Sequence, residues 1–312
     1  MDYLPLEGIS KPVSRLGMGT MVLSTQNPSL SFSLLDRFVE LGGNLIDSAH
    51  VYGGGDCERS LGAWLKARGN RERLILLDKG AHPDHGRDRV TPEDMASDIR
   101  DNLERTGAGY IDLWMMHRDD PKMSVSVIVD FLNSEIKAGR IRAFGGSNWS
   151  IGRIAEVQEY AAKSGQRGFS ANSPNLSLAQ PQDPMWAGCV SLLGPGREWH
   201  RKSRLPVIAW SSQAGGFFTG RFKKEDRGNP DIVRVYYNDD NFERLRRAEV
   251  MGRNKGFSAN AVALAYVLAQ PYPVFSLIGP RALGEFDASF EALALKLSPS
   301  ECEWLNLERN EP

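Results

Sequence analysis

The fold class that this sequence predicts is α/β, as a (β/α)8 TIM barrel, and three observations predict it. Short apolar runs alternate with segments of helical period along most of the 312 residues. Several runs are almost continuously apolar, as strands covered on both faces are. Four successive strand ends, at Asp47, Lys79, His117 and Ser147, lie 32, 38 and 30 residues apart. One strand–helix–strand unit takes ~30 residues, so the chain is expected to form one domain over residues 1–312.

The strands of this barrel are expected at apolar runs that turn residues interrupt. They fall at residues 44–47, 74–77, 110–116, 141–145, 168–171, 206–210 and 274–278. The alternative is a doubly wound open sheet, which normally carries a Gly-x-Gly-x-x-Gly turn after its first strand. Residues 17–22 read Gly-Met-Gly-Thr-Met-Val and lack the third glycine, which favours the barrel.

The helices are expected where capping residues precede a helical pattern. Thr91-Pro92 is typical of an N-cap followed by proline at the first helical position. Further helices are expected over residues 32–41, 124–138, 150–162, 258–270 and 299–307. Two segments rich in proline, glycine and charge, 180–204 and 221–241, are expected to be loops near the barrel mouth.

Composition argues against several classes of partner. The 38 Lys and Arg residues balance 39 Asp and Glu residues, so we expect no nucleic-acid or membrane partner. The cysteines are three in number and far apart, which favours a reducing, cytoplasmic compartment. The longest mostly apolar stretch, 259–269, is about half of a membrane span. His82 and His85 have the spacing of a metal clip but lack a third ligand nearby, so no metal is expected.

Four chemically different side chains come from neighbouring predicted strand ends. Asp47, Lys79 and His117 end three successive strands, and Tyr52 follows Asp47 by five residues. The carboxyl ends of barrel strands share one face, so these groups are expected to converge there. An ammonium beside a phenol lowers the pKa of the phenol, and a neutral imidazole can donate a hydrogen bond to a substrate oxygen. The set predicts addition of a hydride and a proton to a carbonyl group.

Residues 44–53, Asn-Leu-Ile-Asp-Ser-Ala-His-Val-Tyr-Gly, closely resemble the signature of the aldo-keto reductase superfamily. The similarity continues through 58–62 and the strand ends 77–79 and 112–117. This resemblance implies a (β/α)8 barrel that binds NADPH in extended form and reduces aldehydes or ketones to alcohols without a metal. It also implies a catalytic tetrad of Asp47, Tyr52, Lys79 and His117, with Tyr52 as the proton donor.

The same resemblance implies how the cofactor would be held near its nicotinamide end. Ser147 and Asn148 are expected to bind the carboxamide, as an amide needs one donor and one acceptor in fixed positions. On the sixth strand the expected partner is Asn172, or Ser173 if the alignment shifts by one residue. Trp210 is expected to stack on the nicotinamide face.

At the adenosine end, Arg281 is expected to meet the 2′-phosphate. Glu285 stands where Gln or Arg is usual in the family, which leaves NADH possible beside NADPH. The complete set of expected cofactor-binding residues is Gly19, Thr20, Met21, Asp47, Ser147, Asn148, Asn172, Trp210, Ser211, Ser212, Gln213, Ala214, Gly215, Gly279, Arg281, Glu285 and Ser289.

The expected substrate is a small carbonyl compound whose oxygen lies between Tyr52 and His117. The walls of the substrate pocket are expected to come from His50, Trp114, the loop 184–186 and the pair Phe217-Phe218. The competing hypothesis is a non-catalytic or slow nucleotide-binding subunit that senses redox state, since related barrels serve in that way. The intact tetrad favours an enzyme, and the oligomeric state stays open.

Overall fold

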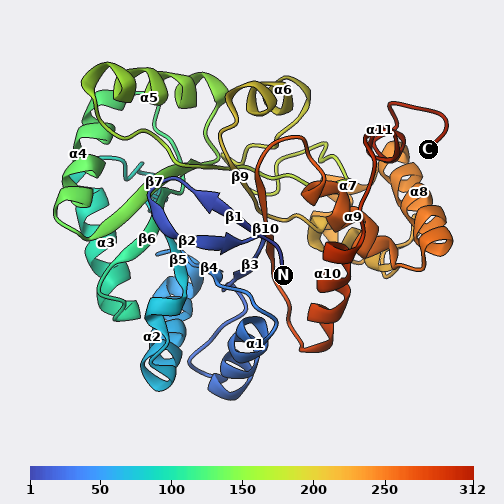
Figure 1. Cartoon of the computed structure of the whole chain (residues 1–312), viewed down its shortest axis with the longest axis horizontal. Helices are drawn as coiled ribbons and strands as arrows, with labels where there is room; N and C mark the ends of the chain where they lie inside the picture. Colours follow the sequence, from blue (N-terminus) through green and yellow to red (C-terminus); the bar gives the residue numbers. More distant parts are fainter.

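A computed structural model describes residues 1–312, and its centre is a closed barrel of parallel strands (Figure 1). The strands pair in the order β10-β3-β4-β5-β6-β7-β8-β9, and β9 closes onto β10. They are β3 (Leu16–Gly19), β4 (Leu45–Asp47), β5 (Ile75–Gly80), β6 (Ile111–Met116), β7 (Ile141–Ser147), β8 (Asn172–Ser173), β9 (Val207–Ala209) and β10 (Val274–Ile278). The predicted (β/α)8 fold is confirmed.

Helices surround the barrel, and α8 and α11 lie furthest from it at one edge of the molecule (Figure 1). The helices are α1 (Pro28–Glu40), α2 (Asp56–Arg68), α3 (Pro92–Thr106), α4 (Val125–Lys137), α5 (Ile151–Ser164), α6 (Gly194–Ser203), α7 (Pro230–Tyr236), α8 (Asp239–Lys255), α9 (Ala259–Leu268), α10 (Gly284–Ala294) and α11 (Pro299–Leu305). Short 3-10 turns lie at Tyr52–Gly55 (η1), Arg71–Arg73 (η2) and Ala214–Thr219 (η3). None of these helices is both long and apolar enough to span a bilayer.

The predicted hydroxyl caps start the helices as expected. The Thr91 side chain accepts a hydrogen bond from the Asp94 backbone N–H, and Ser150 and Ser258 cap α5 and α9 in the same way. Each cap pairs a backbone N–H that would otherwise lack a partner in the first helical turn. The sequence signals at these positions were therefore sufficient.

Three predicted elements differ from the structure. The segment 180–204 contains α6, and 221–241 contains α7 and the start of α8, so neither is only loop. Charged and polar residues dominate α6, which buries only His200, so the apolar period on which the prediction relied is hidden there. Helix α7 buries Ile232, Val235 and Tyr236 but is only seven residues long. The sixth barrel strand is Asn172–Ser173 rather than 168–171, because the polar residues after the apolar run make the ladder to β7 and β9.

A hairpin that the sequence did not reveal closes one end of the barrel. Strands β1 (Tyr3–Leu6) and β2 (Ile9–Ser14) pair antiparallel and lie across the barrel in Figure 1. Leu6 and Val13 pack on the residues that fill the barrel. Since β2 leads directly into β3, the hairpin covers the amino-terminal end, which leaves the carboxyl end of the strands for a site.

Side chains alternate between the barrel interior and the surrounding helix layer. The inner cluster contains Leu45, Ile75, Leu77, Leu113, Met115, Ala143, Ala171, Ile208, Phe275 and Leu277, and the hairpin residues Leu6 and Val13 join it. The residues between them belong to a larger cluster of 62 buried residues against the helices. Because the period of a strand is two, Asp47, Lys79 and His117 continue the inner face toward the carboxyl end.

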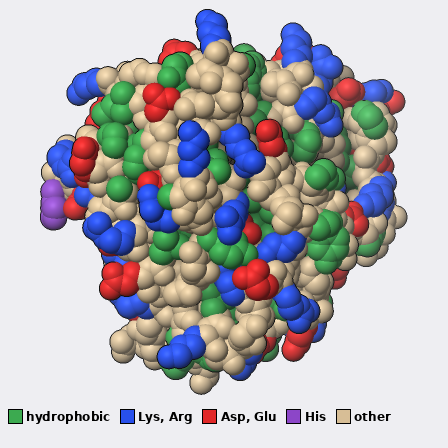
Figure 2. Space-filling view, turned by 60° about the vertical axis from the view of Figure 1, so that its left-hand side comes forward, with side chains coloured by type: hydrophobic (Ala, Val, Ile, Leu, Met, Phe, Trp, Pro, Cys, Tyr) green, Lys and Arg blue, Asp and Glu red, His purple; other side chains and the backbone are tan.

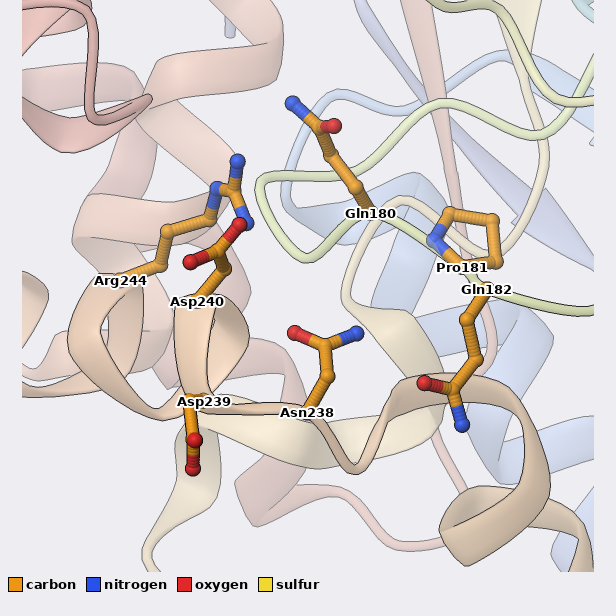
Figure 3. A pocket seen from close by; sticks show the side chains of 7 residues that line it. All are labelled: Gln180, Pro181, Gln182, Asn238, Asp239, Asp240 and Arg244. Atoms are coloured by element: carbon orange, nitrogen blue, oxygen red, sulfur yellow. The ribbon is translucent and has the colours of Figure 1, made fainter.

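The surface and one cavity complete the description. Acidic and basic side chains are interspersed over the face in Figure 2, without separation by sign. A polar cavity of about 360 Å³ lies between residues 180–182 and the start of α8 (Figure 3). It is lined by Gln180, Pro181, Gln182, Asn238, Asp239, Asp240 and Arg244. No tetrad residue borders this cavity, so the reacting groups lie elsewhere.

Candidate active site

The four predicted reacting groups meet at the carboxyl end of the barrel. The Lys79 Nζ lies 2.5 Å from Asp47 Oδ1 and 3.3 Å from the Tyr52 hydroxyl, to which it donates a hydrogen bond. It also donates to the Ser48 backbone oxygen at 2.8 Å. The ring of His117 stands edge-on to that of Tyr52, with centroids 5.8 Å apart. The strand ends thus bring together a carboxylate, an ammonium, a phenol and an imidazole.

Burial and mutual charge set the protonation of this group. Asp47 and Lys79 are both buried, and burial raises the pKa of Asp47 while the adjacent carboxylate raises the pKa of Lys79. Tyr52 is half-buried, and its hydroxyl accepts the hydrogen bond from Lys79. Burial raises the pKa of Tyr52 by more than Lys79 lowers it. The expectation of a lysine-acidified phenol is therefore wrong for this state, because desolvation outweighs the ammonium.

The imidazole of His117 is held neutral. Burial and the positive charges of Lys79 and Arg118 lower its pKa well below the usual range. Its Nδ1 is buried without a hydrogen-bond partner. His82 stands edge-on to the same ring at 4.9 Å, and burial lowers the pKa of His82 as well. Sequence reasoning considered His82 only as a metal ligand, but nowhere do three His, Cys, Asp or Glu side chains converge to hold a metal.

Two expected wall residues contact α3, and one of them is shut off from the mouth. Trp114 is completely buried, and its indole N–H donates to Asn102 of α3. It lies between the inner residues Leu113 and Met115 of β6, so the strand alternation turns it outward. The ring of His50 lies 3.0 Å from the Asp101 carboxylate of α3. The assignment of Trp114 to the substrate wall is therefore wrong, whereas the His50 side chain is 25% exposed and its assignment stays a prediction.

Of the other residues expected to line the substrate pocket, some lie at the mouth and some do not. Phe217 and Phe218 are buried, and the Phe217 ring packs against Phe242 of α8 and its neighbours, so this pair does not line the mouth. Trp186 of the predicted loop lies beside Trp210, with ring centroids 5.9 Å apart. Trp210 is half-buried and packs on the inner barrel cluster. The loop 184–186 therefore reaches the mouth as expected.

The carboxamide segment shows which sixth-strand residue faces the barrel. The Ser147 hydroxyl donates to the Ser173 backbone oxygen, and the Asn148 amide donates to the Ser147 oxygen and the His117 backbone oxygen. The Ser173 hydroxyl is buried without a partner. The Asn172 amide points the other way and contacts His200 of α6 at 3.0 Å. The choice of Asn172 is therefore corrected to Ser173, since neighbouring strand residues face opposite sides.

Segment 211–216 forms a tight turn after β9. Ser211, Ala214, Gly215 and Gly216 all have positive φ, and the Ala214 and Gly216 N–H groups donate within the turn to the Ser211 and Gln213 oxygens. The Arg221 guanidinium folds over this turn and donates to the Gly215 oxygen. Sequence reasoning did not identify Arg221. Ser212 and Ala214 are themselves buried.

The β10 end carries an exposed guanidinium. Arg281 makes no ion pair, and its backbone N–H donates to the Glu285 carboxylate at 2.8 Å. Glu285 is thus engaged at the start of α10. Ser289 is buried and accepts a hydrogen bond from the Gln213 amide, and the cofactor contacts expected for Gln213, Glu285 and Ser289 stay predictions. Gly279 has open space beside its Cα.

The first barrel strand leaves room at the mouth. A Cβ at Gly19 would meet nothing closer than a backbone oxygen at 3.5 Å, and Met21 is 60% exposed. The Thr20 hydroxyl donates to Ser48, which ties this strand end to β4. Glu58, within the signature segment, does not face the mouth; its carboxylate binds Asn102 and Arg105 and joins α2 to α3.

A (β/α)8 barrel whose carboxyl end holds a lysine–carboxylate pair, a phenol and a neutral imidazole defines a class of oxidoreductase that acts on carbonyl groups. The family model of the Aldo/keto reductase family matches residues 15–306. The chain belongs to this family, whose members use nicotinamide cofactors and small carbonyl substrates.

Similar proteins agree with this assignment. The norsolorinic acid reductase stcV of Emericella nidulans is 29% identical, with 95% of this chain and 78% of that protein covered. The probable aryl-alcohol dehydrogenase AAD4 of Saccharomyces cerevisiae is 25% identical, with 91% and 88% covered. The glycerol dehydrogenase AKR11B4 of Gluconobacter oxydans matches in fold with a TM-score of 0.79 at 23% identity, over 98% and 94% of the chains. The chain is an oxidoreductase.

Proposed function

We propose that this protein is an NADPH-dependent reductase that converts aldehydes or ketones to alcohols, with Tyr52 as the proton donor and residues 1–312 acting as one domain. The observation that carries the proposal is the 3.3 Å contact between the Lys79 ammonium and the Tyr52 hydroxyl, with His117 edge-on to the same phenol. Three free cysteines fit a reducing, cytoplasmic setting for this reaction.

The groups at the mouth fit a nicotinamide. The buried Ser173 hydroxyl lacks a partner, and Ser147 and Asn148 lie beside it, so a carboxamide has hydrogen-bonding groups to meet. Trp210 offers a half-buried aromatic face nearby. When bound, the cofactor supplies the hydride.

The side chains of the tetrad supply the remaining chemistry. The raised pKa of Tyr52 keeps the phenol protonated at neutral pH, so the proton is present when the substrate arrives. The neutral His117 ring can donate a hydrogen bond to the carbonyl oxygen as negative charge grows there. After Tyr52 gives up its proton, the phenolate lies beside the Lys79 ammonium. This attraction stabilises the product of proton transfer more than the resting phenol.

Two guanidinium groups support a preference for NADPH. Arg281 is exposed and forms no ion pair, and Arg221 lies over the turn at Gly215. A planar guanidinium matches a phosphate with two hydrogen bonds. Glu285 directs its carboxylate to a backbone N–H, which leaves Arg281 available to the 2′-phosphate.

The test is turnover of a panel of aldehydes and ketones, followed by loss of nicotinamide absorbance with NADPH. Tyr52→Phe removes only the hydroxyl and is expected to lower kcat by about 10²- to 10⁴-fold, the usual contribution of a general acid. Tyr160→Phe is the matched control, because the Tyr160 hydroxyl binds Asp130 on the outer helices. Equal activity of Tyr52→Phe and wild type would overturn the assignment of Tyr52. Nucleotide binding without turnover across the panel would favour a redox-sensing subunit instead.

A further inference from the structure

Arg118, which directly follows His117, is a buried guanidinium without a carboxylate partner. Its side chain is 8% exposed, and no Asp or Glu lies within ion-pair distance of it. Its Nη1 donates to the His117 backbone oxygen at 2.8 Å, and its Nη2 donates to the Cys189 Sγ at 3.4 Å. A thiol is a weak acceptor, so these contacts use little of a group with five N–H donors.

The acids nearest in sequence are already engaged. Asp119 forms an ion pair with Arg153 at 3.0 Å, and the Asp120 carboxylate accepts the Lys122 backbone N–H. The cationic Lys79 is matched by Asp47. Arg118 is therefore the unmatched positive charge beside the reacting groups. Burying an unmatched charge is costly, and in proteins such charges are normally paired or bind a ligand.

The position of Arg118 places it at the mouth. Gly188 packs so closely that a Cβ there would lie 3.2 Å from Arg118 Nε. This glycine belongs to the loop that carries Trp186 to Trp210. The Arg118 Nε has no hydrogen-bond partner and is not fully enclosed, whereas Nη1 and Nη2 make the two contacts above. The guanidinium thus lies between the end of β6 and the loop over the mouth.

The neighbouring imidazoles do not carry charge. Burial and the positive charge of Arg118 lower the pKa of His82, and the pKa of His117 is lowered further. At neutral pH both rings are uncharged, so the positive potential on this side of the mouth comes from Arg118. A low-dielectric site with one unmatched cation attracts an anionic group.

We propose that Arg118 binds a carboxylate of the substrate, so that the preferred substrates are carbonyl compounds that also carry a carboxylate. This inference rests on the proposed carbonyl reductase activity and names its substrate class. A guanidinium binds a carboxylate through two parallel hydrogen bonds, which would fix the carbonyl relative to Tyr52 and His117. Arg118 acts in binding and orientation and takes no part in proton transfer.

The test compares 2-, 3- and 4-carboxybenzaldehyde with their methyl esters, which have the same ring and aldehyde but no charge. For each isomer, kcat/KM of the acid is divided by kcat/KM of its ester. For the isomer whose carboxylate can reach Arg118, this ratio is expected to be about 10- to 100-fold higher in wild type than in Arg118→Met. Dividing by kcat/KM of the ester removes differences between the variants in folding and in general activity. Arg118→Lys is expected to keep an intermediate ratio, because it retains charge without the planar fork.

Arg201→Met is the matched control, since Arg201 is an exposed arginine of α6 that pairs with Glu198. It is expected to leave the acid-to-ester ratio unchanged. An equal ratio in wild type and Arg118→Met for all three isomers would overturn the proposal while the reductase stands. If wild type turns over neither acids nor esters nor the wider aldehyde panel, the reductase proposal fails, and this inference falls with it.

A measurement on wild type alone covers the case in which the variants do not fold. The alcohol 4-(hydroxymethyl)benzoate and its methyl ester are compared as product inhibitors, together with the 2- and 3-isomers. At least one acid is expected to inhibit about 10-fold more strongly than its ester. Equal inhibition by every acid and its ester contradicts a carboxylate site at Arg118.

Discussion

Removal of the lysine charge tests the buried ion pair at the centre of the site. In Lys79→Met, Asp47 stays buried without the ammonium that lies 2.5 Å away in the native protein. The side chains of both residues are at most 4% exposed, so water cannot replace the lost partner. The variant also loses the hydrogen bonds from Lys79 to the Ser48 oxygen and the Tyr52 hydroxyl.

The expected loss in the free energy of unfolding is about 3 to 5 kcal/mol at neutral pH, as for other buried pairs that lose one partner. The double variant Asp47→Asn/Lys79→Met removes both charges and is expected to lose only about 1 to 2 kcal/mol. The difference measures the coupling of the two charges. Lower pH should restore part of the single variant's stability, because burial raises the pKa of Asp47 in the folded state above its unfolded value. The folded state then binds more protons, and stability falls as pH rises through this range.

The assay is urea unfolding followed by circular dichroism at about pH 5 and about pH 8 for wild type, the single variant and the double variant. Asp47→Asn alone completes the cycle. A loss below about 1 kcal/mol in Lys79→Met at the higher pH would refute a buried, charged pair. The same conclusion would follow if the double variant had no greater free energy of unfolding than Lys79→Met.

The other predictions concern pH, the carboxamide and the cofactor. The pKa of Tyr52 is raised and that of His117 is lowered, so neither group should change its protonation between about pH 7 and about pH 9. The kcat/KM of carbonyl reduction should therefore stay constant over this range, whereas the rate of alcohol oxidation should rise with pH. A kcat/KM of reduction that falls over this range contradicts the prediction. Ser173→Ala should weaken nucleotide binding about 5-fold in a fluorescence titration, the effect of one hydrogen bond, whereas Asn172→Ala should lower Tm and leave that Kd unchanged. Arg281→Ala should raise KM for NADPH about 10-fold and leave KM for NADH within about 2-fold, and equal effects on both would refute contact with the 2′-phosphate.

Strand alternation explains where the sequence predicted the site correctly and where it did not. Asp47, Lys79 and His117 end runs whose apolar residues fix the strand, so their convergence followed from the barrel. Trp114 is continuously flanked by apolar residues, and such a run does not reveal which residues face inward. The same ambiguity applied to Asn172, where a shift of one residue reverses the side.

Other features depended on contacts distant in sequence. The hairpin β1–β2 is short, and its role becomes evident only where Leu6 and Val13 meet the barrel interior. The charged helix α6 buries only His200 and so lacks the apolar stripe by which a helix is recognised in a sequence. The position of His82 beside His117 joins two strand ends that the chain separates by a complete helix.

The sequence by itself determined the alternation of strand and helix, the family signature and the placing of Asp47, Lys79 and His117 at strand ends, because periodicity and spacing are local properties. Only the tertiary structure decided that burial raises the pKa of the Tyr52 phenol, that Ser173 faces the barrel, and that Arg118 is buried without a carboxylate. Burial and the pairing of charges depend on which distant segments pack around a group, and the order of residues along the chain does not specify that.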